Sequence, residues 1–138
     1  MTMDLTMPAL KPLATALIID DDEDILYLLR LLMLRDGFIV HTATNGRDAT
    51  DFITNSEPTD IVLTDLMLPY VSGFEVIRQI REHPAWKHVP VVVLSGKVTE
   101  RDAVQALELG ANDYVPKPYS PLELSARVKR HLEIRRRA

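Results

Sequence analysis

The sequence contains no cysteine among its 138 residues. A disulfide scaffold, a thiolate metal site and a cysteine nucleophile are therefore excluded, and the chain suits a reducing compartment. Long hydrophobic runs are also missing, because the apolar stretches end after four or five residues, whereas a membrane-spanning helix needs about 20. The N-terminal residues include Asp4, Pro8 and Pro12 and do not resemble a secretory signal. We therefore expect a cytoplasmic protein that makes no membrane contact.

Positive charge is scarce in most of the chain. The sequence has 16 Lys and Arg residues against 20 Asp and Glu, a formal net charge of −4. Residues 127–138 hold six of the basic residues and one acid, which leaves 10 basic and 19 acidic residues in the rest. A nucleic-acid-binding domain typically shows a basic face across its fold, so we expect no direct nucleic-acid binding. The basic end suits the negative pole of a terminal helix; contact with phosphates and continuation into a second domain are the alternatives.

The remaining composition is that of a folded domain. Hydrophobic and charged residues, at 46% and 26%, match an average soluble domain, and 138 residues suit one domain. Apolar runs rich in Val, Ile and Leu alternate with stretches of helical periodicity, which indicates a parallel sheet covered by helices. We predict an α/β, flavodoxin-like fold with a doubly wound five-stranded parallel sheet, order 2-1-3-4-5, and helices on both faces. The predicted strands are residues 14–20, 38–43, 60–65, 89–95 and 113–115, and the predicted helices are 24–35, 45–55, 73–82, 99–109 and 121 onward.

Local signals mark where the helices begin. Asn45 and Thr99 are typical N-cap residues, and Ser120 followed three residues later by Glu123 has the pattern of a capping box. The first helix should bury one apolar stripe, formed by Ile25, Leu28, Leu29, Leu32 and Met33.

The chain divides into three parts. We expect residues 1–13 to form a flexible N-terminal arm and residues 14–135 to form the folded domain. Residues 136–138 are a basic C-terminal end. The protein either stands alone or was cut from a longer chain, in which case this end is a truncated linker to an absent effector domain.

Acidic residues collect where two neighbouring strands of the predicted sheet end. Asp20 and Asp21 close the first strand and Asp65 closes the third, and in this topology both ends face one crevice. Carboxylates brought this close repel each other, and a hard divalent cation offsets the repulsion. Mg²⁺ suits the crevice because it prefers oxygen ligands and keeps several waters, with Mn²⁺ as a substitute. Asp22 and the two acids after it are better explained as the cap of the first helix.

Two more polar residues fall on the same edge. Ser95 ends the fourth strand and offers a hydroxyl, and Lys117 follows the fifth strand and can reach an anion held above the metal. A carboxylate nucleophile, a metal, a lysine and a hydroxyl around one crevice describe a phosphoryl-transfer site. Each signal is weak alone, but their order and their placement at strand ends together indicate this chemistry.

Four segments carry a resemblance to a known family: LIIDDDEDI, DIVLTDLMLPYVSGFEVI, VPVVVLSGK and GANDYVPKPYSPLEL. They resemble the receiver, or phosphoacceptor, domain of bacterial two-component response regulators, and the resemblance runs from about residue 14 to residue 135. It implies phosphorelay signal transduction, in which the domain accepts a phosphoryl group from a sensor histidine kinase or a histidine phosphotransfer protein and signals to a downstream effector. A receiver assists its own phosphotransfer and autodephosphorylation, so it is not a turnover enzyme.

The resemblance also implies a role for individual residues. Asp65 would be the phosphoacceptor, Lys117 would pair with the phosphoryl group through a loop with a cis Lys117–Pro118 peptide, and Ser95 would bond a phosphoryl oxygen. Tyr114 stands at the aromatic switch position of the family, although it could equally be an ordinary half-buried strand residue. The Mg²⁺ ligands would be Asp21, Asp65, the backbone carbonyl of Met67, and Asp20 through water or hydrogen bonding.

The signalling face in this family combines the helix at 99–109, the strand at 113–115 and the last helix. Asp113 and Arg127 resemble the charged pair through which one transcription-factor subfamily dimerises, and Glu123 fits the same pattern. The usual basic partner on the preceding helix is Gln105 in this chain. The resemblance therefore implies no more than a weak homodimer through this face.

Two other function classes use a similar topology. A phosphatase with an aspartate nucleophile typically has a second Asp two residues after it, where this chain has Met67. A nucleotide- or flavin-binding module needs a Gly-rich or Ser/Thr-rich phosphate loop after the first strand, where this chain has DDDED. Uptake of one phosphate from acetyl phosphate and Mg²⁺ would separate a receiver from both.

Overall fold

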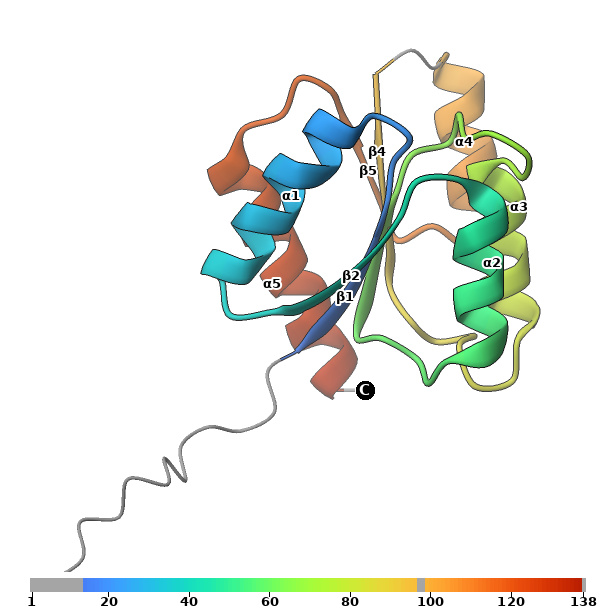
Figure 1. Cartoon of the computed structure of the whole chain (residues 1–138), viewed down its shortest axis with the longest axis horizontal. Helices are drawn as coiled ribbons and strands as arrows, with labels where there is room; N and C mark the ends of the chain where they lie inside the picture. Colours follow the sequence, from blue (N-terminus) through green and yellow to red (C-terminus); the bar gives the residue numbers. More distant parts are fainter. Residues whose placement is uncertain (1–13, 97–98, 138) are drawn as a thin grey trace, which may run out of the picture.

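The computed structural model describes residues 14–96 and 99–137; the predicted flexible arm, residues 1–13, lies outside them. Across the described residues, five strands and five helices alternate. Helices α1 and α5 cover one face of the sheet, and α2, α3 and α4 cover the other (Figure 1). In this part of the chain no helix has both the length and the apolar content of a membrane span. The elements are β1 Thr15–Ile19, α1 Glu23–Arg35, β2 Ile39–Ala43, α2 Gly46–Asn55, β3 Ile61–Thr64, α3 Gly73–Glu82, β4 Val91–Ser95, α4 Glu100–Glu108, β5 Asp113–Pro116 and α5 Pro121–Arg137.

The sheet is parallel and has the strand order β2-β1-β3-β4-β5, which confirms the predicted topology. β1 and β3 are neighbours, with Ile19 opposite Thr64. The residues that follow these two positions therefore leave the sheet side by side at its carboxyl edge. On the other side of β3, Ser95 of β4 pairs with Pro116 of β5. Lys117 follows Pro116 and therefore also lies at the carboxyl edge of the sheet.

Two apolar layers fix the helices to the sheet. β1, β3 and β4 are buried on both faces, as their runs of Val, Ile and Leu predict. Trp86 is fully buried in the layer under α2 and α3, where its indole N–H donates to the carbonyl oxygen of Ser56 at 3.2 Å. Each fully buried aliphatic side chain contributes about 1.5–3 kcal/mol, so these layers hold the strand ends in a fixed arrangement.

Helix α1 departs from the predicted stripe at one position. Leu29, Leu32 and Met33 are buried as predicted, and Leu26 is buried with them. Leu28 is exposed, so its place in the predicted stripe is wrong. α1 is apolar around most of its circumference, and periodicity alone cannot show which part of such a helix the sheet covers.

The predicted helix starts are largely confirmed. The side chains of Asn45 and Thr99 cap α2 and α4. The hydroxyl of Ser120 accepts from the N–H of Glu123 at 3.4 Å, but the Glu123 carboxylate pairs with Arg127 at 2.9 Å. Within the described residues, the last helix thus has one half of the predicted capping box.

The charged pair on β5 and α5 is formed within one chain. Arg127 donates to Asp113 at 3.1 Å, and His131, which has no obvious partner in the sequence, lies 3.0 Å from the same carboxylate. Burial disfavours ionisation, but the hydrogen bonds from His131 and Arg127 outweigh it and hold the pKa of Asp113 below its usual value. A homodimer through α4, β5 and α5 would have to form although Asp113 and Arg127 already pair within one chain. The homodimer stays a prediction.

One arginine of the basic stretch at residues 127–138 contacts the body of the domain. Arg135 donates to the carbonyl oxygens of Thr59 and Asp60 at 3.4 and 3.1 Å. This side chain ties the last turns of α5 to the start of β3.

Candidate functional site

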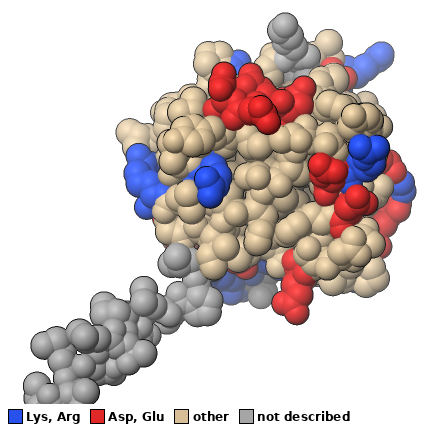
Figure 2. Space-filling view, in the orientation of Figure 1, with Lys and Arg blue, Asp and Glu red and all other residues tan. Residues whose placement is uncertain are grey.

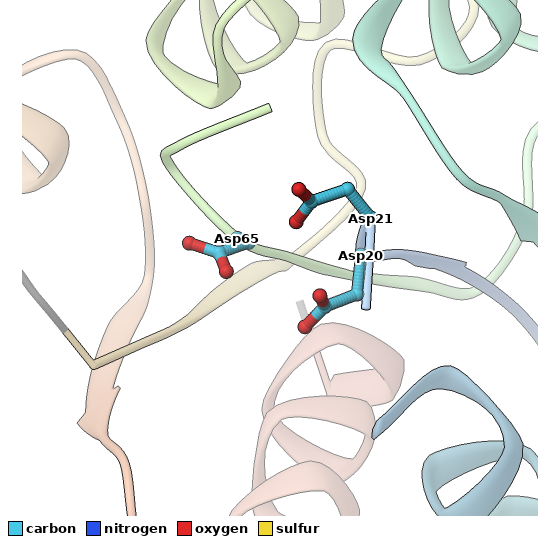
Figure 3. A group of neighbouring side chains, drawn as sticks. All are labelled: Asp20, Asp21 and Asp65. Atoms are coloured by element: carbon cyan, nitrogen blue, oxygen red, sulfur yellow. The ribbon is translucent and has the colours of Figure 1, made fainter. Parts of the chain in front are cut away.

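Three carboxylates meet at the carboxyl edge of the sheet. Asp20 and Asp21 follow β1, Asp65 follows β3, and their side chains come together there (Figure 3). One carboxylate oxygen from each lies within 4.8 Å of the others. Acidic side chains gather on the surface over this end of the molecule (Figure 2). The sequence predicts this cluster because the two strands are adjacent and parallel, so their carboxyl ends share one edge.

Asp20 is the buried member of the cluster. One of its carboxylate oxygens accepts from the N–H of Asp22 at 2.9 Å, and the other accepts from Nζ of Lys117 at 2.8 Å. Burial penalises the ionised form more than these hydrogen bonds favour it, so the pKa of Asp20 is raised above its usual value. The hydrogen bond from Lys117 is the largest of the contributions that favour the ionised form of Asp20.

Asp65 is fixed in one orientation by four donors. Its Oδ1 accepts from the backbone N–H groups of Leu66 and Met67 at 2.6 and 3.2 Å and from the Ser95 hydroxyl at 2.7 Å. Its Oδ2 accepts from Nζ of Lys117 at 3.1 Å. Oδ2 thus keeps more unused acceptor capacity than Oδ1, while the carboxylate as a whole cannot rotate freely.

Lys117 bridges two of the three carboxylates. Burial opposes its charge, but the hydrogen bond to Asp20 and the negative charges of Asp65 and Asp20 outweigh burial and raise the pKa of Lys117. Lys117 is therefore an ammonium at neutral pH. The Lys117–Pro118 peptide is cis, as the resemblance implies.

An open cavity of about 430 Å³ joins these groups. Its lining includes Asp20, Asp21, Asp65, Ser95, Lys117 and Met67. All the predicted site residues except Tyr114 thus line one cavity.

Tyr114 lies behind the site on β5. Its half-buried ring packs against the apolar layer under α2, α3 and α4. Its hydroxyl lies 3.5 Å from the carbonyl oxygen of Ser95, at the long limit of a hydrogen bond. Burial raises the pKa of Tyr114, so the hydroxyl keeps its proton. The ring is therefore next to the backbone of the residue that contacts Asp65, without entering the cavity.

Two features of the site escaped the sequence reasoning. A Cβ at Gly73 would lie 2.1 Å from the carbonyl oxygen of Asp65, so glycine alone lets α3 begin this close to the site. Gly73 also donates to the carbonyl oxygen of Leu66 at 2.8 Å, which holds the loop after Asp65. In the sequence Gly73 is an ordinary residue at a helix start. The second feature is the contact of Lys117 with Asp20. The sequence reasoning gave Lys117 a different partner, an anion held above the metal.

The donor set fits a hard divalent cation. Three carboxylates that converge at an open cavity provide the oxygen ligands of Mg²⁺ and leave room for the waters it retains. Asp22, the next acid along the chain, is the N-cap of α1, and its carboxylate accepts from the N–H groups of Asp24 and Ile25. The predicted separation of Asp20 and Asp21 from the helix cap is thereby confirmed.

Comparisons with known proteins agree with this geometry. The family model for the response regulator receiver domain matches residues 16–129. A response regulator receiver domain protein from Clostridium thermocellum is 30% identical, with a TM-score of 0.81 over 90% of this chain and 98% of its own. A response regulator receiver domain protein from Methanospirillum hungatei JF-1 is 25% identical, with a TM-score of 0.85 over 91% of this chain and 98% of its own. The receiver domain of a sensor histidine kinase from Pseudomonas aeruginosa PAO1, solved with a magnesium ion coordinated in its active site cleft, is 24% identical, with a TM-score of 0.80 over 87% of this chain and 98% of its own.

Proposed function

The chain belongs to the response regulator receiver domain family, and from this premise we propose that it acts in a phosphorelay, accepting a phosphoryl group on Asp65 in a reaction that needs Mg²⁺. The observation that carries the proposal is the setting of Asp65. Asp65 lies at an open cavity, grouped with the carboxylates of Asp20 and Asp21 and next to a lysine ammonium and a hydroxyl. A carboxylate held this way is a nucleophile whose surroundings are already arranged for incoming negative charge.

In the proposed transfer, Asp65 is the nucleophile and Lys117 stabilises negative charge. An oxygen of Asp65 attacks the phosphorus of a phosphohistidine, a phosphorus–oxygen bond forms, and the phosphorus–nitrogen bond breaks as the imidazole leaves with its electron pair. Oδ2 is the oxygen we assign to the attack, because Oδ1 already accepts from three donors. The Lys117 ammonium lies 3.1 Å from Oδ2 and stabilises the charge that develops on the phosphoryl oxygens.

The cation would be held by Asp21 and Asp65 directly, by Asp20 through water or hydrogen bonds, and by the backbone carbonyl of Met67. When bound, it supplies positive charge that neutralises the carboxylates and the equatorial phosphoryl oxygens. Mg²⁺ is the expected ion and Mn²⁺ a substitute. The three converging carboxylates support this assignment, as does the magnesium ion in the Pseudomonas receiver domain.

Intact-mass measurement tests the proposed function directly. With acetyl phosphate and Mg²⁺, the protein should gain one phosphoryl group, and hydroxylamine should remove it, as expected for an acyl phosphate. Excess chelator should abolish the adduct. A protein that stays unmodified at saturating donor and metal would contradict the proposal, and so would an adduct that forms equally well in chelator.

The metal prediction has a matched pair of variants. Asp21→Asn and Asp22→Asn remove the same charge from adjacent positions, and Asn caps a helix about as well as Asp, so α1 keeps its cap in the second variant. In chelator, Asp21→Asn should raise the unfolding midpoint because it relieves repulsion within the cluster. Added Mg²⁺ should then stabilise the parent and Asp22→Asn by mass action, and leave Asp21→Asn unchanged. Equal metal responses in the two variants would show that Asp21 is not a ligand.

The output step would begin at Ser95. Its hydroxyl now donates to Asp65 Oδ1, and a phosphoryl oxygen would offer a stronger, charged acceptor a short distance away. The end of β4 would move with the hydroxyl, and the Tyr114 hydroxyl beside the Ser95 carbonyl would have to follow. We expect this movement to reshape the face made by α4, β5 and α5.

Ser95→Ala should separate phosphorylation from switching. The variant should still take up phosphate, because Asp65 and Lys117 are untouched. Uptake should be slower than in the parent, because the Ser95 hydroxyl is missing. Its response at Tyr114 should be weakened by about 1–3 kcal/mol, the usual size of such couplings. Beryllofluoride, a stable mimic of the phosphoryl group, allows an NMR comparison of residues 99–119 in both proteins. Equal shifts across that face in both would exclude Ser95 as the coupling residue.

We infer that the partners are a sensor histidine kinase or histidine phosphotransfer protein as donor and a downstream effector domain or protein as target. We also infer that the protein is a phosphoacceptor rather than a turnover enzyme, because Asp65 is consumed by each transfer until the acyl phosphate is hydrolysed. A cytoplasmic location follows from the same proposal, since a kinase domain that uses ATP must meet its acceptor there.

A further inference from the structure

The outer face of α1 carries exposed apolar side chains that the proposed chemistry leaves unused. Leu28 is 63% exposed and Leu31 is 44% exposed, and Tyr27 and Leu34 are similarly open. Half of the exposed positions of this helix are therefore large apolar side chains. Scattered surface leucines are normal, but a contiguous apolar strip along one helix is typical of an interaction surface.

The charges at the ends of the strip form a regular pattern. Asp24, Leu28, Leu31 and Arg35 follow each other at spacings of four, three and four residues, so they lie in one line along the exposed face. The line begins with an acid, continues with two leucines and ends with a base. The surface over α1 shows the same polarity, with acidic side chains at its N-terminal end, basic side chains at the other end and a largely uncharged region between them (Figure 2).

This line is complementary to itself when it is reversed. In an antiparallel pair of α1 helices, the two copies are related by a two-fold axis. If this axis passes midway between positions 28 and 31, Leu28 of one copy faces Leu31 of the other. The same axis sets Asp24 against Arg35 of the partner, at both ends of the line. A parallel pair would instead place acid on acid and base on base. Antiparallel pairing is also the arrangement that a two-fold axis perpendicular to the helices requires.

A groove beside the strip provides space for the partner. It runs between α1 and the start of α5 and is lined by Leu28, Leu32, Tyr119 and Pro121, among other residues. Leu122, 74% exposed, projects from the start of α5. The groove ends at Lys117 and Gly96, which also line the carboxylate cavity. A side chain seated in the groove would therefore touch the wall of the site.

We propose that the protein self-associates through α1, with the Asp24–Leu28–Leu31–Arg35 line of one copy packed antiparallel against the same line of a second copy. A single helix face buries less than the ~800 Å² per partner of a standard interface. The dimer therefore exchanges with monomer, and its share rises with protein concentration. The proposal does not depend on phosphorylation, and it differs from a dimer through α4, β5 and α5.

Sedimentation velocity over a wide concentration range measures the association without a phosphodonor or metal. The parent should shift from monomer toward dimer as its concentration rises. Leu31→Glu should stay monomeric, because it places like charges at the centre of the interface. Leu107→Glu on α4, which makes the same change at a similarly exposed leucine, should dimerise like the parent. Melting curves of both variants should match the parent closely, since surface substitutions typically change stability by about 0.5 kcal/mol or less.

The absence of native cysteine allows a test of the register. A mixture of Asp24→Cys and Arg35→Cys should form a mixed disulfide under mild oxidation, because these positions face each other across the axis. Each variant alone should cross-link poorly, since its two copies lie 11 residues, or about 16 Å, apart along the helix. Disulfides need Cα atoms within about 7 Å. Mass spectrometry distinguishes the mixed disulfide from the two symmetric ones.

Three results would overturn the proposal. A chain that is monomeric at every concentration would leave the strip to another partner, such as the phosphodonor. A monomer that dimerises only after residues 1–13 are deleted would assign the strip to that segment. A dimer that survives Leu31→Glu, or that cross-links most readily between identical cysteine variants, would have a different interface. None of these outcomes affects the assignment of Asp65.

Discussion

Asp65→Asn should take up no phosphoryl group under conditions in which the parent is modified completely. The amide that replaces the carboxylate is isosteric, so the hydrogen bonds around it are largely kept, but it has no anionic oxygen to attack phosphorus. Asp51→Asn is the matched control, because it removes the same charge from an exposed position on α2 away from the cavity. Intact mass after incubation with acetyl phosphate and Mg²⁺ reads out both variants.

Asp20→Asn belongs in the same experiment because Asp20 is the other carboxylate that Lys117 contacts. It should be phosphorylated on Asp65 at a reduced rate, since the metal site loses a carboxylate and the acceptor remains. Peptide mapping after borohydride reduction locates the acyl phosphate. Modification of Asp65→Asn at any carboxylate with the parental yield would refute the assignment of the acceptor. Loss of the adduct in Asp20→Asn with full labelling of Asp65→Asn would move the role to Asp20.

The sequence predicted that the candidate site residues would lie together, because their positions depend on topology. Asp20, Asp65 and Lys117 each follow a strand, and a parallel sheet brings the carboxyl ends of its strands to one edge. Knowledge of the strand order is then enough to predict that the three meet. The apolar runs of β1, β3 and β4 place these strands in the middle of the sheet, because they are buried on both faces, and the order itself comes from the doubly wound fold class.

What the sequence could not supply depends on side-chain direction and close approach. The exposure of Leu28 depends on how α1 is rotated about its axis, and α1 is too uniformly apolar for periodicity to fix this rotation. The contact of His131 with Asp113 joins two elements by a side-chain conformation that no local pattern encodes. Gly73 is required by a backbone contact with Asp65, a distance set only once both elements are in place.

Loss of Lys117 should also destabilise the fold, because it leaves a buried carboxylate without its charged partner. Lys117→Met keeps the length and apolar stem of the side chain and removes the charge. The Asp20 side chain is only 2% exposed, so its carboxylate would be left almost without water and without its ammonium partner. Removing one member of a buried ion pair costs on the order of 3 kcal/mol. Urea unfolding in chelator should show that the free energy of unfolding of Lys117→Met is lower than that of the parent by this amount.

A second substitution tells lost charge from lost packing. In Asp20→Asn the carboxylate is already gone, so Lys117→Met should cost much less there, and the double-mutant cycle should give a coupling of a few kcal/mol. Equal costs of Lys117→Met in the two backgrounds would mean that packing, rather than charge, explains the loss.

The pH dependence of the same variant should follow from the direction of the Asp20 shift. Burial already raises the pKa of Asp20 in the parent, and Lys117→Met removes the hydrogen bond and the charge that oppose burial, so the pKa should rise further. A carboxyl group whose pKa is raised by folding stabilises the native state below its unfolded-state pKa, and this contribution is lost as pH rises through the folded-state pKa. The stability deficit of Lys117→Met should therefore be full at neutral pH and shrink as the solution is acidified and Asp20 takes up a proton. Unfolding curves of the parent and Lys117→Met at a series of pH values measure this, and a deficit that grows on acidification would contradict the role assigned to Asp20.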